Sequence, residues 1–413
     1  MQHLDFIVFG VGRNGTTALA NSLNLHPEVF CGIERFHYNV APERIVFPES
    51  FRDQSFVCAP ANAQRTDEEL KSKGDFIMFA GNKNPRYFCA LEAWRKFNPA
   101  IKKIAIYRSP WHYLASWKNR AERQNDAWHP ALQGPFGLYE LFEMLRATID
   151  FAEDTLLVPY DAFYFENDQA INQILDHLGA DPARFPRAVF IDNIFAQPGR
   201  TRERPALDPE IADMLDIARI DDLDRLLMRA DPYRIGDIRY DIEQWLESLP
   251  GTLGELAEAW LLQRDNDQLH ELLVSWVRTF PKLGAGANPS VLPPTFKAYH
   301  DLLFGTEPAK RSAALALRDR AVKLPAVNMI LARIYTSQGN PREASKALRS
   351  VIEANPRLIA AYRQLALLLS QEGRWQEAAS VIALALEFAA DNVDLLKLYR
   401  KFKRGGSAPQ QIG

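Results

Sequence analysis

The sequence predicts an α/β domain with a central parallel sheet, followed by an all-α domain of helical repeats. Two observations predict the first domain. A buried strand runs into a glycine-rich loop and a helix near the N-terminus, and similar strand–loop–helix stretches recur before residue 124. A third observation, a 34-residue repeat after residue 330, predicts the second domain. Strands that alternate with helices favour a parallel sheet covered by helices on both faces.

The first strand, loop and helix occupy residues 6–27. The short apolar run F-I-V-F is typical of a strand buried on both faces, and three glycines then interrupt it. A helix that begins near residues 15–17 would point its free N–H groups and its positive dipole end at a ligand in the loop. The pattern therefore predicts an anion site, and a purely structural strand-to-helix turn is the alternative.

The glycine loop nearly fits the ATP-binding pattern G-x-x-x-x-G-K-[ST]. Gly10 and Gly15 have the required spacing, and Thr17 stands where a hydroxyl would hold a metal. Thr16 occupies the place of the lysine, however, and the nearest cation is Arg13 inside the loop. We therefore expect a P-loop-like fold that binds a phosphate without the lysine and magnesium clamp for a β,γ-phosphate pair.

The composition restricts the class of protein. A length of 413 residues allows two or three domains, and a net charge of −3 excludes an overall basic nucleic-acid-binding protein. No apolar run approaches the ~18 residues of a membrane span, and the first five residues are no cleavable leader, so we expect a cytoplasmic protein. Three cysteines without a C-x-x-C pair support neither a disulfide framework nor a zinc site.

Two charged residues follow apolar runs. Glu34 comes after the run 29–33 and would act as a general base if it faced the anion site, whereas a surface glutamate is the alternative. Lys83 comes just past a strand predicted at 76–80, where a ligand contact and a solvated lysine are both open. Residues 36–75 are expected to be irregular, as a lid, an acceptor-binding insertion or a surface excursion.

Arg108 and Ser116 form a second candidate pair. Arg108 directly follows a strand predicted at 103–107, and Ser116 lies eight residues later in a helix predicted at 111–123. An arginine with a hydroxyl partner suits a phosphate, because the guanidinium binds two oxygens at once.

Three segments together resemble the sulfotransferases that use 3′-phosphoadenosine 5′-phosphosulfate (PAPS). They are G-V-G-R-N-G-T-T, K-N-P-R-Y and Y-R-S-P-W-H-Y-L-A-S, in this order and at the ends of three predicted strands. The resemblance implies that the first loop binds the 5′-phosphosulfate, and that the arginine and serine eight residues apart hold the 3′-phosphate. It assigns cofactor binding to Gly12, Arg13, Asn14, Gly15, Thr16, Thr17, Arg108 and Ser116.

The resemblance also implies three catalytic side chains. Arg13 would contact the leaving phosphate, and Lys83 is similar to the lysine of the K-T-P-x-Y segment of the glycosaminoglycan sulfotransferases, with Asn84 replacing the threonine. The run H-P-E-V-F-C-G-I-E resembles the tyrosylprotein sulfotransferases, whose catalytic glutamate falls on Glu34. The glycan enzymes often have a histidine two residues after that glutamate. Here His37 comes three residues after it, so His37 has no assigned role.

The resemblance continues after the third predicted strand. The run L-L-V-P-Y-D at 156–161 is similar to the family strand that ends in Y-E-D-L. Gly199, Arg200 and Thr201 resemble the late basic loop that closes over the nucleotide, and a solvated arginine loop is the alternative. The likeness covers about residues 1–230.

The C-terminal part contains the repeat. The period and the small residues resemble the tetratricopeptide repeat, which has two antiparallel helices per unit. Since about three units are usually needed for stability, we expect a degenerate first unit at 296–324 and a capping helix at 393–402. The repeats would bind a protein partner or acceptor chain, or mediate self-association, and both remain open. The recurring residues are Leu331, Ala332, Gly339 and Ala344, which return as Leu365, Ala366, Gly373 and Ala378.

These features divide the chain into four segments. We expect a PAPS-binding sulfotransferase domain at 1–232, a helical connector at 233–290, tetratricopeptide-like repeats at 291–404 and a disordered tail at 405–413. The expected reaction is an in-line sulfuryl transfer to a hydroxyl or amine, with no metal in the chemical step and adenosine 3′,5′-bisphosphate as product. Glu34 would take the acceptor proton, while Arg13 and Lys83 would neutralise charge on the leaving phosphate.

The sequence leaves the acceptor open among a glycan, a lipid, a tyrosyl peptide and a small metabolite, and it does not define the oligomeric state. Two alternatives belong to other functional classes. A nucleotide-dependent kinase would share the loop and sheet, and a non-catalytic scaffold would use the repeats as its working part.

Overall fold

The chain forms two compact units, Met1–Ala257 and Glu258–Gly413. The division falls within the connector predicted at 233–290, and the finer division into four segments remains a prediction. The computed structural model describes residues 3–58, 60–122, 134–166, 168–195, 203–228, 234–264, 266–279, 291–320 and 324–405.

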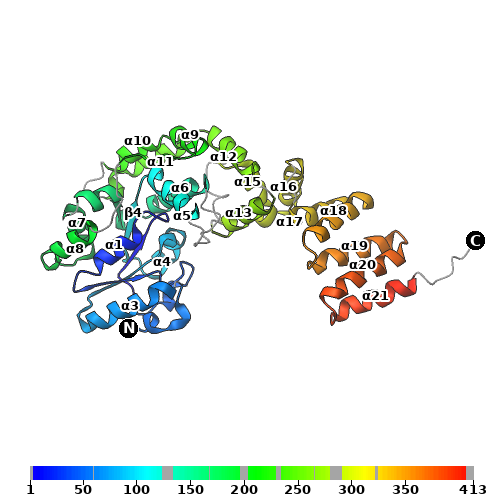
Figure 1. Cartoon of the computed structure of the whole chain (residues 1–413), viewed down its shortest axis with the longest axis horizontal. Helices are drawn as coiled ribbons and strands as arrows, with labels where there is room; N and C mark the ends of the chain where they lie inside the picture. The colour runs from blue at the N-terminus through cyan, green and yellow to red at the C-terminus, as the bar shows by residue number, and fades with distance from the viewer. Residues whose placement is uncertain are drawn as a thin grey trace, which may run out of the picture. The chain divides into compact units, whose positions relative to one another are not determined.

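Five parallel strands form the central sheet of the first unit (Figure 1). Their order in the sheet is β2-β3-β1-β4-β5. Because all five are parallel, their carboxyl ends meet at one edge, which is where open α/β sheets bind ligands. This sheet with its flanking helices, followed by an all-helical region, confirms the predicted fold class. The strands are β1 (Phe6–Phe9), β2 (Val29–Ile33), β3 (Phe79–Lys83), β4 (Lys102–Tyr107) and β5 (Thr155–Pro159).

The strand predicted at 76–80 is wrong by three residues, because β3 begins at Phe79. Phe76 and Met78 are 73% and 60% exposed, whereas Asn82 and Lys83 are fully buried. The prediction followed the apolar residues, but the strand ends in polar residues. Polar side chains can occupy a buried strand end where they find hydrogen-bond partners.

The helices α1 (Thr16–Leu23) and α7 (Asp168–Leu178) pack on one face of the sheet. Leu19 and Leu23 of α1 share a hydrophobic cluster with Ile171 of α7 and with side chains of β1, β4 and β5. All four residues of β1 are inaccessible to solvent. The predicted strand, loop and helix at the start of the chain are therefore confirmed, and the loop between them is anchored at both ends.

The expectation that residues 36–75 are irregular is wrong. They contain the short helix α2 (Glu49–Arg52) and the 14-residue helix α3 (Pro60–Lys73), which packs on β2. Within the part of α3 whose side chains are described, the buried residues are Thr66 and Leu70. Two buried residues are too few to give a recognisable apolar pattern with a 3.6-residue period. The sequence therefore did not predict this helix.

The first unit contains further α-helices among its described residues (Figure 1). In the described part of the chain, no helix has both the length and the apolar character needed to cross a bilayer. These helices are α4 (Leu91–Phe97), α5 (Pro110–Glu122), α6 (Phe136–Ile149), α8 (Arg187–Phe195), α9 (Pro209–Ile217), α10 (Ile220–Leu227), α11 (Arg239–Glu247) and α12 (Thr252–Leu262), the last of which crosses the division.

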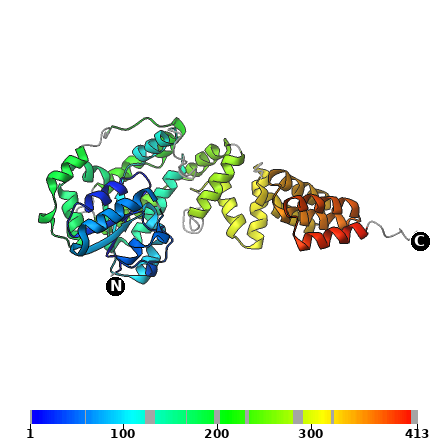
Figure 2. The ribbon, with the colours of Figure 1, turned by 60° about the horizontal axis from the view of Figure 1, so that its bottom comes forward.

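The described part of the second unit is helical (Figure 2). Consecutive helices pack together as α15 with α16, α17 with α18, and α19 with α20. The starts of α17, α19 and α21 are 34 residues apart, and the recurring Leu331 and Leu365 are both buried. The region is thus consistent with helical repeats, and their tetratricopeptide type remains a prediction. The helices are α13 (Asn266–Thr279), α15 (Pro294–Phe304), α16 (Glu307–Asp319), α17 (Pro325–Ser337), α18 (Pro341–Ala354), α19 (Ile359–Gln371), α20 (Trp375–Phe388) and α21 (Val393–Gly405).

The predicted capping helix corresponds to α21, and the predicted degenerate first unit corresponds to α15 with α16. Of the predicted disordered tail, Gly405 is the last residue of α21, and residues 406–413 lie outside the described ranges.

Candidate functional site

The loop between β1 and α1 has the backbone geometry of an anion cradle. Arg13 and Gly15 both adopt left-handed conformations, with φ angles of 69° and 92°. Such residues turn successive N–H groups toward one side of a loop. Because α1 begins at Thr16, the N–H groups of its first turn have no partner within the helix and point toward the same loop.

Two aromatic side chains hold this loop from outside. A Cβ atom on Gly12 would lie 2.6 Å from the ring of Trp117, whose Nε1 donates to the Gly12 carbonyl (3.2 Å). A Cβ atom on Gly15 would lie 3.0 Å from the ring of Tyr160, which follows β5. Inside the loop, the buried Asn14 amide donates to the carbonyl of Ile106 in β4 (3.3 Å). The loop glycines are therefore required by close packing as well as by backbone conformation.

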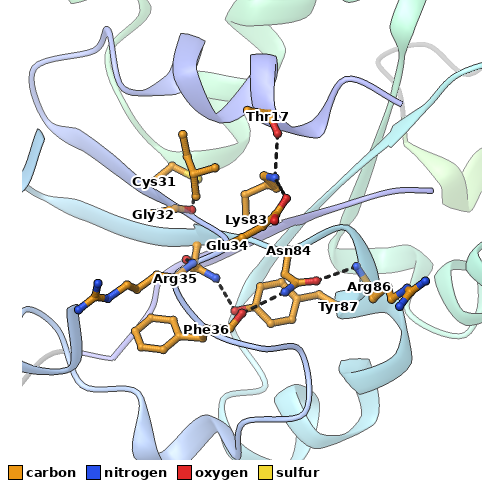
Figure 3. A network of polar contacts seen from close by, with 12 residues as sticks. Thr17, Cys31, Gly32, Glu34, Arg35, Phe36, Lys83, Asn84, Arg86 and Tyr87 are labelled. Atoms are coloured by element: carbon orange, nitrogen blue, oxygen red, sulfur yellow. Dashed lines mark hydrogen bonds and ion pairs between the residues drawn. The ribbon is translucent and has the colours of Figure 1, made fainter. Parts of the chain in front are cut away.

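Lys83 joins the helix after the loop to the end of β2 (Figure 3). Its Nζ donates to Thr17 Oγ1 (2.9 Å) and forms an ion pair with Glu34 Oε1. The Lys83 side chain is fully buried, whereas that of Glu34 is 30% exposed. Burial lowers the pKa of Lys83, and the Glu34 carboxylate opposes this effect. The pair thus consists of a buried cation and a carboxylate that solvent or a substrate can reach.

Arg13, Ser116 and Arg108 are linked at the same edge of the sheet. Arg13 Nε donates to Ser116 Oγ (3.1 Å), and Arg108 Nη1 lies 3.4 Å from the Arg13 carbonyl oxygen, to which it donates. The Arg108 guanidinium also stacks over the ring of Tyr160 at 4.4 Å from the ring centroid. The Arg108 guanidinium and the Ser116 hydroxyl therefore lie beside Arg13 of the glycine loop, although they are 95 and 103 positions away from it in the sequence.

A pocket of about 240 Å³ opens at the carboxyl ends of β4 and β5. Arg108 and Tyr160 line it, together with Asp224 of α10. Burial raises the pKa of Asp224 to about 6, and the Tyr107 hydroxyl, which donates to this carboxylate, opposes the shift. Burial also lowers the pKa of His112 on the same wall. Arg108 therefore borders this pocket, whose described lining contains no residue of the glycine loop.

The structure brings Arg13, Arg108 and Ser116 together, and separately joins Lys83, Glu34 and Thr17. The strand predicted at 76–80 placed Lys83 in a loop. In the structure Lys83 is instead the last residue of β3. Gly199, Arg200 and Thr201 lie outside the described residues.

One feature of the site was not predicted from the sequence. Asn82 is fully buried and binds the backbone next to Glu34, and the only signal for it was a polar residue between a glycine and a lysine. The exposed His37, left without a role, has its Nδ1 2.5 Å from Asn39 Oδ1. Among the described residues, no three His, Cys, Asp or Glu side chains form a group that could hold a metal ion.

Comparison with known proteins gives one family match. Residues 5–183 match the model of the sulfotransferase family. Among solved structures, a sulfotransferase from Alicyclobacillus acidocaldarius is similar, with a TM-score of 0.35 and 15% identity, over 55% of this chain and 97% of that chain. No curated protein matches the chain. The family match spans β1 to β5 and includes every predicted site residue except Gly199, Arg200 and Thr201.

Proposed function

Because residues 5–183 match the sulfotransferase family, we propose that this protein transfers the sulfuryl group of PAPS to a hydroxyl or amine of an acceptor. One observation supports the proposal above all. Lys83 Nζ contacts both Thr17, in the first turn after the glycine loop, and Glu34, a partly exposed carboxylate. A cation between an anion cradle and a candidate base suits the transfer of an anionic group to a nucleophile that must lose a proton.

The donor would be held at two points. The N–H groups of the glycine loop, with Arg13, would bind the 5′-phosphosulfate. Arg108 and Ser116 would bind the 3′-phosphate. The hydrogen bond between Arg13 and Ser116 supports the proposal that one ligand contacts both groups. The remaining proposed contacts come from Gly12, Asn14, Thr16, Thr17, Gly199, Arg200 and Thr201.

In the proposed reaction, the acceptor oxygen or nitrogen attacks sulfur while Glu34 takes its proton. The bond between sulfur and the bridging phosphate oxygen breaks, and adenosine 3′,5′-bisphosphate leaves. Lys83 and Arg13 would stabilise the negative charge that develops on the leaving oxygen, as fixed charges do in phosphoryl transfer. The chain's own residues supply positioning, charge and a proton acceptor.

A transfer assay with labelled PAPS, screened over glycan, lipid, tyrosyl-peptide and small-metabolite acceptors, tests the proposal. We expect Glu34→Gln to lose most turnover and keep affinity for adenosine 3′,5′-bisphosphate. Arg108→Ala should weaken bisphosphate binding about 10- to 150-fold, because a hydrogen bond to a charged group contributes about 1.5–3 kcal/mol. Glu92→Gln and Lys96→Ala, on the exposed surface of α4, are the matched controls and should change neither property.

Two results would contradict the proposal. Calorimetry could show no binding of adenosine 3′,5′-bisphosphate, or the protein could transfer phosphate from ATP in the presence of magnesium, as a kinase would. The binding of a partner or self-association through the second unit remains a prediction, as does the cytoplasmic location.

A further inference from the structure

The backbone at Glu34 is strained and is held by specific contacts. Glu34 has a φ of 51°, in the left-handed region that non-glycine residues seldom adopt. Its N–H donates to the Lys83 carbonyl (2.7 Å), across the pair of parallel strands β2 and β3. Such conformations persist only where the surroundings over-determine them, and they are concentrated at functional sites.

The next residue, Arg35, is fixed at three points. Its N–H donates to Asn82 Oδ1 (3.3 Å), its carbonyl accepts from the Cys58 N–H (3.1 Å), and its buried guanidinium donates through Nη2 to the Asp53 carbonyl (3.0 Å). Of these contacts, only the one to Asn82 comes from the sheet, and Asn82 directly precedes Lys83. The same short stretch of β3 therefore sets the position of Lys83 and the direction in which the chain leaves Glu34.

The orientation of the Asn82 amide follows from its neighbours. A backbone N–H can only donate, so the amide oxygen must face Arg35, and Nδ2 then donates to the hydroxyl oxygen of Tyr87 (2.6 Å). Asn82 and Tyr87 are both fully buried, and the Tyr87 ring packs edge-on against Trp94. A Cβ atom on Gly32 would lie 2.7 Å from Asn82 Oδ1, so only a glycine leaves room for this amide. Figure 3 shows Tyr87, Gly32 and Arg35 near Glu34 and Lys83.

We propose that Asn82 and Tyr87 are positioning residues for Glu34. Tyr87 fixes the Asn82 amide, and that amide holds Arg35, so that Glu34 keeps its left-handed backbone and its carboxylate stays against Lys83. This inference rests on the proposed role of Glu34 as the base. Neither residue would touch the donor or the acceptor.

The test uses Tyr87→Phe, which removes only a buried hydroxyl. Tyr113→Phe is the matched control, because Tyr113 is also fully buried and its hydroxyl donates to the Gly137 carbonyl (2.8 Å). We expect Tyr87→Phe to lower turnover at saturating donor about tenfold, with affinity for adenosine 3′,5′-bisphosphate unchanged within about twofold. Tyr113→Phe should keep turnover even if both variants lose similar thermal stability. Equal turnover in the two variants would overturn the inference.

A double-mutant cycle and a structure complete the test. If Tyr87 acts through Asn82, adding Tyr87→Phe to Asn82→Ala should lower turnover by less than about twofold further, whereas additive losses would contradict the inference. A crystal structure of Tyr87→Phe should show Glu34 outside the left-handed region or its carboxylate away from Lys83, and an unchanged Glu34 would overturn the inference. This readout needs no activity, so an absence of sulfuryl transfer in the wild-type protein would refute the proposed function and leave the positioning test intact.

Discussion

Replacing Lys83 with methionine should separate stability from activity. The Lys83 cation is fully buried, and burial lowers its pKa, so carrying the charge at neutral pH already costs folding free energy. Methionine has similar length and no charge, and the Glu34 carboxylate that loses its partner is 30% exposed and can be solvated. We expect Lys83→Met to reduce the free energy of unfolding by at most about 1 kcal/mol, or to increase it.

Glu34→Gln should be the more damaging change to stability. It leaves the Lys83 charge buried, with only amide and hydroxyl oxygens as acceptors. We expect a loss of about 3 kcal/mol, at the low end for breaking a buried pair because the hydrogen bonds persist. Without the carboxylate the pKa of Lys83 falls further. Since the unfolded lysine titrates near 10.4, the unfolded state then binds more protons at alkaline pH and the loss should shrink as pH rises toward 10.

Turnover should respond differently from stability. Both single variants should lose turnover, and Lys83→Met should lose about 10²- to 10³-fold, which is typical when one charge-stabilising donor is removed. Urea denaturation at pH 7 and pH 10 would measure the free energy of unfolding of the wild type, both single variants and the double variant. The exposed pair Lys96–Glu92, substituted in the same way, is the control and should change stability by less than about 0.5 kcal/mol per variant. The reasoning fails if Lys83→Met is less stable than Glu34→Gln, or if the double variant is no more stable than Glu34→Gln.

Three further predictions concern other parts of the molecule. Asp224→Asn should be up to about 3 kcal/mol more stable than the wild type at pH 8 and equal to it below pH 4. The pKa of Asp224 is raised to about 6 in the folded state, so the wild type loses stability as pH rises from about 4 to 6, whereas asparagine does not titrate. Urea denaturation across this pH range would refute it if the difference had the opposite sign. Gly12→Ala should weaken adenosine 3′,5′-bisphosphate binding at least about tenfold in calorimetry, since the new methyl group would press on Trp117 at 2.6 Å, and unchanged affinity would count against the cradle. In the second unit, Leu365→Ala should cost about 2–5 kcal/mol of unfolding free energy, whereas Leu367→Ala, whose side chain is 36% exposed, should cost much less, and equal losses would refute the repeat packing.

The sequence by itself determined the features that depend on short stretches of chain. The apolar run, the glycines and the helix that follows them identify β1, its loop and α1, because strand burial and glycine conformation are local properties. Arg108 and Ser116 were found in the same way, from a strand end and a helix only eight residues apart. The 34-residue repeat likewise predicted the spacing of α17, α19 and α21, since each unit repeats its own local pattern.

Only the tertiary structure decided which of these residues meet. Lys83 contacts Glu34 and Thr17, which are 49 and 66 positions away in the sequence, because β3 pairs with β2 so that Ile33 lies opposite Lys83. Strand register arises from pairing between distant segments, and no local pattern records it. The same pairing puts the buried Asn82 beside the backbone that follows Glu34, where an amide in a strand acquires a partner that its own neighbours in the sequence cannot supply.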